Sequence, residues 1–145
     1  MFSGSRVSFW GATFSSGWVN FSGAVFSGGT VDFRGTELSD GAVFFSRATF
    51  SGSTFDFRGV VFDGRVDFLD ATFSGGAVDF GEATFSGGRI DFPEATFSGG
   101  RIYLTRARFT GGIVDFSQAT GPAPAGLLPP SGHPRPAGLI VPPTW

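Results

Sequence analysis

The sequence predicts an all-β protein, a β-solenoid in which very short strands of successive coils stack on one another. Three observations predict it. Large apolar residues recur every twelve residues in two interleaved series, and the residue two positions before nearly all of them is also apolar. Turn-forming residues follow each large residue. The stretch "ATFSGGRI" shows the period directly, because it begins at Ala83 and begins again at Ala95.

The large residues mark the inward positions of the expected strands. The first series is Phe14, Phe26, Leu38, Phe50, Phe62, Phe73, Phe85, Phe97 and Phe109. The second series is Phe9, Phe21, Phe33, Phe45, Phe57, Phe68, Phe80, Phe92, Leu104 and Phe116. Both series contain one step of eleven residues at the same place, "FDGRVDF" at 62–68, where one residue of the Ser-Gly-Gly segment is missing.

The expected strands follow from the residue two positions before each large apolar residue. It is usually Ala before the first series and Val or Ile before the second, with a polar residue between. Side chains two apart on a strand point the same way, so each unit has two inward side chains. Apolar spacing never follows a period of 3.6, and Gly recurs throughout, which excludes helix. Strands this short are stable only when they stack, about 4.8 Å apart, into a solenoid with a Phe-filled interior.

Units such as "ATFSG" at 83–87 and 95–99 resemble the pentapeptide repeat family, and "VDFRG" at 31–35, "VDFGE" at 78–82 and "IDFPE" at 90–94 fit the same frame. The resemblance covers roughly residues 2–120 and implies a right-handed quadrilateral β-helix. Every second unit here carries two extra residues, which predicts about 24 residues per coil, nearly five coils and a wider corner. A left-handed hexapeptide β-helix is the alternative, disfavoured because spacings of five and seven never relax to six.

We expect two regions, the solenoid at 1–120 and a Pro-rich tail at 121–145. The Pro density of the tail favours an extended or disordered segment, and its apolar residues leave open that it folds back as a cap. The chain starts in the middle of a repeat. We therefore expect either that the protein begins earlier or that this uncapped end pairs with another chain, giving a homodimer.

Composition excludes several classes of function. The chain has no Cys, and its one His, His133, lies in the tail, so no catalytic set, metal site or cofactor site is expected and the protein is not expected to be an enzyme. A net charge of −2 without a basic cluster argues against direct nucleic-acid binding, and no apolar run suggests a membrane segment. All ten basic residues are Arg, which suggests a bacterial, cytoplasmic protein.

Candidate functional positions lie on the outside of the coils. With 24 residues per coil, Asp residues form two surface ladders on opposite sides, with Arg nearby: Asp32, Asp56 and Asp79, and Asp67, Asp91 and Asp115. The ladders could imitate a phosphate backbone or could be ordinary solvated positions, and the second interpretation is favoured. Three residues near the last coil depart from the consensus and are a candidate edge contact: Tyr103, Arg106 and Arg108.

A second outward pattern is Thr between Ala and Phe, at Thr13, Thr49, Thr72, Thr84 and Thr96. A flat Thr array could bind ice, but the array is interrupted by Val25, Glu37, Val61 and Arg108. The interruptions favour the simpler interpretation that Thr suits a strand with one face in water.

The favoured function is a structural or protein-interaction module with an unidentified protein partner. The resemblance implies an alternative, since some pentapeptide repeat proteins imitate DNA, bind type II topoisomerases such as gyrase and protect them. Ice or surface binding through the Thr positions is a weaker alternative.

Overall fold

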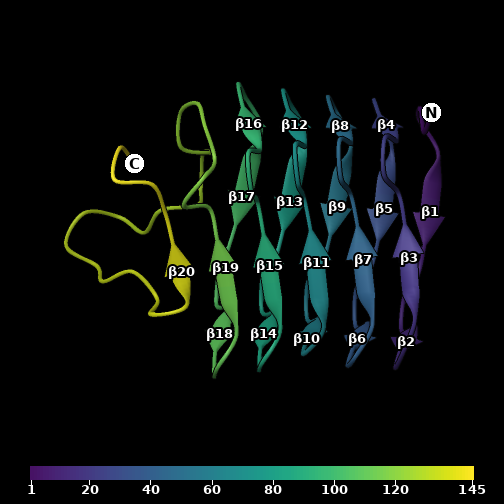
Figure 1. The fold of residues 1–145 in the computed structure, drawn as a ribbon, viewed down its shortest axis with the longest axis horizontal. Coiled ribbons are helices and arrows are strands. Elements are labelled where there is room, and N and C mark those ends of the chain that lie inside the picture. Colours follow the sequence, from purple (N-terminus) through teal and green to yellow (C-terminus); the bar gives the residue numbers. More distant parts are fainter.

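The structure of residues 1–145, a computed structural model, contains twenty short strands and no helix. The strands form four parallel sheets that enclose one interior (Figure 1). The β1 sheet contains β1 (Arg6–Ser8), β5 (Thr30–Asp32), β9 (Thr54–Asp56), β13 (Ala77–Asp79) and β17 (Arg101–Tyr103). The β2 sheet contains β2 (Thr13–Phe14), β6 (Glu37–Leu38), β10 (Val61–Phe62), β14 (Thr84–Phe85) and β18 (Arg108–Phe109).

The other two sheets complete the four sides. The β3 sheet contains β3 (Trp18–Asn20), β7 (Ala42–Phe44), β11 (Arg65–Asp67), β15 (Arg89–Asp91), β19 (Ile113–Asp115) and β20 (Leu139–Ile140). The β4 sheet contains β4 (Val25–Phe26), β8 (Thr49–Phe50), β12 (Thr72–Phe73) and β16 (Thr96–Phe97). The chain visits the four sheets in turn, so the β1 sheet lies opposite the β3 sheet and the β2 sheet opposite the β4 sheet.

The register confirms the predicted coil length. Val31 pairs with Phe55, 24 residues later, and Val43 pairs with Val66, 23 residues later, across the shortened segment at 62–68. The predicted four-sided β-solenoid is therefore the observed fold. No helix of the structure is long and apolar enough to cross a membrane.

The core consists of four columns of stacked side chains, most of them Phe rings, one behind each sheet. One continuous column runs through Phe21, Phe45, Phe68, Phe92 and Phe116, whose ring centroids are 5.3, 4.9, 4.5 and 4.1 Å apart. Rings in neighbouring columns meet edge to face or tilted, the other geometry that aromatic quadrupoles favour. The interior is thus filled by side chains, and the coils hold one another in register.

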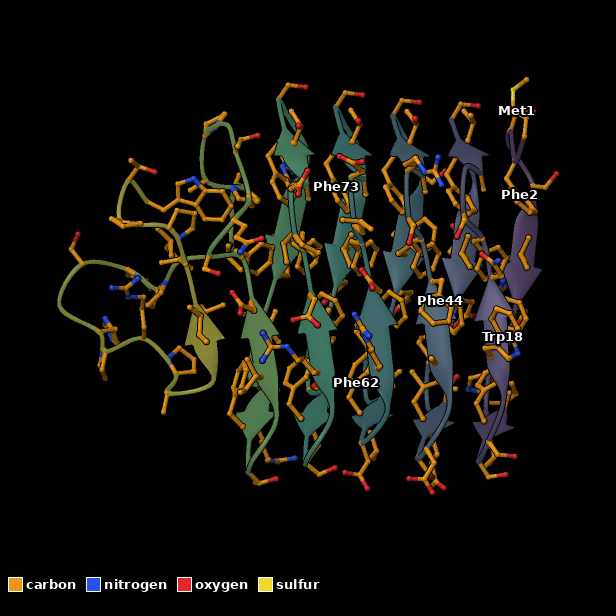
Figure 2. All side chains as sticks on the ribbon, in the orientation of Figure 1. Met1, Phe2, Trp18, Phe44, Phe62 and Phe73 are labelled. Carbon is orange, nitrogen blue, oxygen red and sulfur yellow. The ribbon has the colours of Figure 1, made fainter.

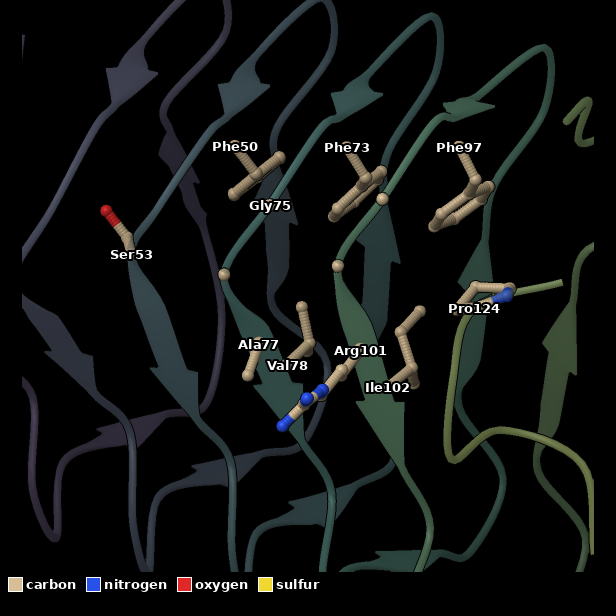
Figure 3. Close-up of a pocket in the computed structure, with 13 residues that line it drawn as sticks. Phe50, Ser53, Phe73, Gly75, Ala77, Val78, Phe97, Arg101, Ile102 and Pro124 are labelled. Atoms are coloured by element: carbon tan, nitrogen blue, oxygen red, sulfur yellow. The ribbon is translucent and has the colours of Figure 1, made fainter. Parts of the chain in front are cut away.

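The corners of each coil are of two kinds. Tight corners contain one residue in the left-handed region. This residue is a glycine at Gly11, Gly23, Gly35 and Gly59, and it is Arg47, Asp70, Glu82, Glu94 or Arg106 at the other tight corners. Wide corners contain the two extra residues of the seven-residue units, as the sequence predicts. There Gly76 has φ +77°, and a Cβ on it would lie 2.2 Å from the carbonyl oxygen of Ser53 in the preceding coil. Figure 3 shows this corner beside the column of Phe50, Phe73 and Phe97.

Substitutions at two glycines distinguish the cost of backbone strain from the cost of a steric clash. Gly59 has φ +68° with open space where a Cβ would be, so Gly59→Ala is expected to cost only the strain, about 1–2 kcal/mol. Gly76→Ala adds a clash with backbone that cannot move without opening the coil, so its loss should be clearly larger. Urea unfolding of both variants measures the difference. Equal losses would show that the wide corners are free to relax.

The Pro-rich tail lies across the last coil. Its carbonyl oxygens accept hydrogen bonds from the edge of that coil: Ile102 donates to Ala125, Val114 to Gly138 and Phe116 to Ile140. Leu127 and Leu139 are buried. The indole Nε1 of Trp145 donates to the Gly121 carbonyl at 2.9 Å, and its ring contacts Phe97 and Phe116. The tail runs through several tight turns and covers the end of the solenoid.

Candidate interaction surfaces

The β1 sheet carries a continuous row of ion pairs on its outer face. Asp32, Asp56 and Asp79 stack in direct register, and Arg side chains lie between them. Arg34 donates to Asp32 at 2.7 Å and lies 3.6 Å from Asp56 of the next coil. Arg58 repeats the pattern, at 2.6 Å from Asp56 and 3.8 Å from Asp79. The row therefore alternates in sign along the rod.

Asp32 is the most enclosed carboxylate of this row, with 1 % of its surface exposed. Hydrogen bonds from the Arg34 side chain, with a further one from Arg6, hold the pKa of Asp32 well below its ordinary value, although burial acts in the opposite direction. Burial also acts to raise the pKa of Asp56, but hydrogen bonds from Arg58 outweigh it and lower that pKa. The carboxylates are charged and matched by guanidinium groups.

This pairing predicts a pH dependence of stability. In the unfolded chain Asp32 titrates near its ordinary pKa of about 3.9, and in the folded chain it titrates lower, so the folded state holds fewer protons there. Its contribution is complete above about pH 4 and is lost as the pH falls below that value toward the folded pKa. We expect Asp32→Asn to be destabilised at pH 7, with the difference from wild type shrinking at pH 3 and below. Urea unfolding at both pH values measures it.

The control is Asp40→Asn, since Asp40 is exposed and makes no ion pair, and it should leave stability at pH 7 unchanged. A difference between wild type and Asp32→Asn that stays the same from pH 7 to pH 2 would show that the ion pairs of Asp32 contribute nothing.

The β3 sheet carries a second row of ion pairs on the opposite side. Asp67, Asp91 and Asp115 stack in register. Arg65 lies 2.8 Å from Asp67 and 3.9 Å from Asp91, and Arg89 pairs with Asp91 and, at 2.7 Å, with Asp115. The structure thus places the six candidate Asp residues in two rows on opposite sides of the rod. In both rows the negative charge is largely matched by Arg.

An apolar patch of Trp18, Ala42 and Phe44 occupies the first coils of the β3 sheet, where the ion pairs have not yet begun (Figure 2). Trp18 is 73 % exposed and meets Phe44 edge to face at 6.0 Å. Phe44 stands in register with Asp67, so it takes the outward position that Asp holds in later coils. This patch is not among the positions predicted from the sequence, although Phe44 directly before Phe45 breaks the Asp-Phe pattern and could have indicated it.

Comparison with known families gives one match. The family described as pentapeptide repeats (9 copies) matches residues 40–84 and 57–104. Residues 40–104 belong to the pentapeptide repeat family. The coils on both sides of this segment continue the same register, from β1 through β19. No curated protein and no solved structure matches the chain significantly.

The three candidate edge residues of the solenoid lie on two different faces. Tyr103 follows Asp79 in the β1 sheet row, and Arg106 lies at the next tight corner with φ +57°. Both line a shallow hollow with Arg58, Asp79 and Glu82, and Arg106 lies 3.7 Å from Glu82. Arg108 projects from the β2 sheet instead, in register with Thr84. The structure therefore joins Tyr103 and Arg106 and separates Arg108 from them.

The Thr residues of the pentapeptide units also divide between two faces. Thr13 and Thr84 lie on the β2 sheet, in the same row as Glu37, Val61 and Arg108. The β4 sheet carries the others in one row: Val25, Thr49, Thr72, Thr96 and Thr120. Three of the four interruptions noted in the sequence therefore belong to the opposite face. On the β4 sheet only Val25, at the first position, departs from Thr.

Proposed function

We propose that this protein is a non-enzymatic interaction module whose contact surface is the apolar patch of Trp18, Ala42 and Phe44. The observation that carries the proposal is the exposed Trp18 ring held edge to face against Phe44. Trp10 is as exposed as Trp18 but has no aromatic neighbour, and most other outward positions hold charged or small polar side chains. The patch is thus the place where burying the surface against a partner brings the largest hydrophobic gain.

The patch is well suited to protein binding because it is rigid. Phe44 belongs to β7, which pairs with β3 and β11 on its two sides. Phe45, the next residue, is fully buried and stacks between Phe21 and Phe68. A partner would therefore bind a surface that is already ordered, and little conformational entropy would be lost on binding. The ion pairs of Arg65 with Asp67 border the patch and would form a polar rim.

A lack of catalytic function is part of the proposal. No group of three or more His, Asp or Glu side chains is arranged to hold a metal ion. The carboxylates of the two rows lie in similar environments, because each is paired with Arg. General acid-base catalysis uses two groups in different environments, one that acts as the acid and one that acts as the base.

The test is photo-crosslinking from a benzoylphenylalanine placed at position 44, in extracts of the source organism. We expect one dominant adduct, and the protein in it is then purified for titration calorimetry. Trp18→Ala should weaken binding by on the order of 10–30-fold, since a Trp of this kind contributes about 2 kcal/mol when buried. Trp10→Ala is the matched control, because Trp10 is equally exposed, at 73 %, but lies outside the patch.

Equal effects of the two Trp substitutions would contradict the assignment of the surface. A purified partner that binds the Trp18→Ala variant with unchanged affinity would do the same, even if the crosslink forms.

A further inference from the structure

We infer that a hollow on the β1 sheet row is a binding site for a guanidinium group, the head group of arginine. The hollow has a volume of about 400 Å³ and lies where that row of ion pairs stops. Asp79, Gly81 and Tyr103 are among the residues that line it. In the two preceding coils an Arg side chain occupies the corresponding place, and here that side chain is missing.

The two earlier Asp residues of the row each receive a guanidinium group from the residue two positions further along the chain. The Nε and Nη2 atoms of Arg34 donate to the two carboxylate oxygens of Asp32 at 2.9 and 2.7 Å. Arg58 donates to Asp56 in the same way, at 2.8 and 2.6 Å. Asp79 is the next Asp in register, but the residue two positions after it is a glycine. The chain therefore supplies no such guanidinium group to Asp79.

The Asp79 carboxylate is nevertheless held as the earlier ones are. The Gly81 amide donates to its Oδ1 at 2.8 Å, just as the Arg58 amide donates to Oδ1 of Asp56 at 3.2 Å. Arg58 of the preceding coil, at 3.8 Å, is its one ion-pair partner. The exposed fraction of the side chain rises from 1 % at Asp32 through 11 % at Asp56 to 31 % at Asp79. Asp79 is therefore a positioned carboxylate with room for a further donor.

The other walls of the hollow also match a guanidinium group. Tyr103 stands in register with Asp79, so an aromatic ring takes the place of the next carboxylate of the row. This ring packs against the tail, since a Cβ on Gly126 would lie 2.8 Å from it. The flat face of a guanidinium group stacks favourably on an aromatic ring. Glu82, on the rim of the hollow, adds a second negative charge.

The charges of the hollow favour a cation over an anion. The Nε and Nη2 groups of Arg58 are already engaged by Asp56, and Arg106 lies on the rim beside Glu82. A phosphate or carboxylate ligand would meet the Asp79 carboxylate without a free donor to offset the repulsion. Among cations, guanidinium fits better than the ammonium of lysine, because its planar fork can donate to both oxygens of one carboxylate.

The experiment is an NMR titration of the isotope-labelled complete chain with N-acetyl-L-arginine amide, which we call capped arginine. We expect the amide signals of Gly81, Glu82 and Tyr103 to shift, with a dissociation constant on the order of 1 mM for a single group at an open site. The matching capped lysine should bind about tenfold more weakly, since it cannot form the planar pair.

Free L-arginine is the third probe, and it distinguishes two sources of the same group. Capped arginine binding as tightly as free arginine would support an arginine side chain of a protein partner as the ligand. Clearly tighter binding of free arginine would support the free amino acid instead.

Gly81→Arg is the decisive variant, because it supplies the missing side chain from the chain itself, as Arg34 and Arg58 do. It should abolish the shifts caused by capped arginine and raise the temperature of unfolding. Glu82→Gln should weaken binding severalfold. Its matched control is Glu94→Gln, because Glu94 occupies the same kind of left-handed corner, at φ +57° against +58°, and lies outside the hollow.

Three results would overturn the inference: no shift at Gly81 or Tyr103 with capped arginine, equal affinity for capped lysine, or a folded Gly81→Arg variant that binds capped arginine as wild type does. The hollow lies on the β1 sheet and the proposed protein-binding patch on the β3 sheet, so the two proposals can fail separately. Trp18→Ala should therefore bind capped arginine with unchanged affinity.

Discussion

A chain that ends at Thr120 is expected to self-associate, whereas the complete 145-residue chain should remain a discrete species. Truncation removes Ala125, Gly138 and Ile140, whose carbonyls accept hydrogen bonds from the last coil, and it uncovers the rings of Phe97 and Phe116. An exposed parallel edge above an apolar core can accept a strand from another copy. Contact of the last coil of one copy with the first coil of the next does not close on itself, so it would form open chains.

The Pro residues explain why the tail ends the stack. Pro lacks an N–H group and cannot extend the hydrogen-bond ladder to a further strand. The last hydrogen-bonded strand, β20, is two residues long and is followed after Val141 by Pro142 and Pro143. The tail thus accepts hydrogen bonds from the coil below and offers few donors above. This is the same protection that natural sheets place on their edges.

Light scattering coupled to size exclusion, at several protein concentrations, measures the effect. A milder double variant, Leu139→Asp with Trp145→Ala, should show partial association, because it removes a buried side chain and the indole contact while the rest of the tail remains. His133→Ala, in an exposed part of the same tail, is the control and should behave as wild type. A truncated chain that elutes as a monodisperse monomer would show that the tail is not needed as a cap.

The same measurement addresses the expected homodimer. Since the tail covers the last coil, pairing would have to involve the first coil, where β1, β2 and β3 each have only one neighbouring strand. A concentration-independent dimer of the complete chain would support this pairing, and a monomer would count against it.

Phe68→Ala is expected to be the most destabilising single substitution in the core, at about 3–5 kcal/mol. Phe68 is fully buried and stacks between Phe45 at 4.9 Å and Phe92 at 4.5 Å, in the middle of its column. It also meets Phe50 and Phe73 of the adjacent column. The hydrogen-bonded coils above and below cannot close a cavity of this size without breaking their register, so little of the loss can be recovered.

Phe68→Leu is the matched control and should cost less than about 1.5 kcal/mol. Leu38 already occupies an equivalent inward position and is fully buried there, which shows that the coil accommodates Leu. Guanidinium unfolding followed by circular dichroism gives both values. Equal losses for the two variants, or a loss near zero for Phe68→Ala, would show that the coils adjust freely to an empty position in the ring stack.

The sequence alone determined the solenoid, because the inward residues are defined locally. Each Phe or Leu with an apolar residue two positions before it specifies a short strand, and a repeat of such strands can be buried only by stacking. The coil of 24 residues and the register of Asp67 with Asp91 follow by addition once four sides are assumed. The segment at 62–68 is one residue shorter than its equivalents. A wide corner absorbs the missing residue, so the register continues beyond it.

What the sequence could not give was which outward residues meet and what covers the end. Thr72 and Thr84 look alike along the chain, twelve residues apart, yet half a coil places them on opposite faces. Trp18 and Phe44 become a patch only because one coil brings them together. The composition of the tail suggested disorder, since Pro excludes regular structure. Only the open edge of the last coil, with its unpaired N–H groups and exposed rings, supplied the partners that order Trp145 and Leu139.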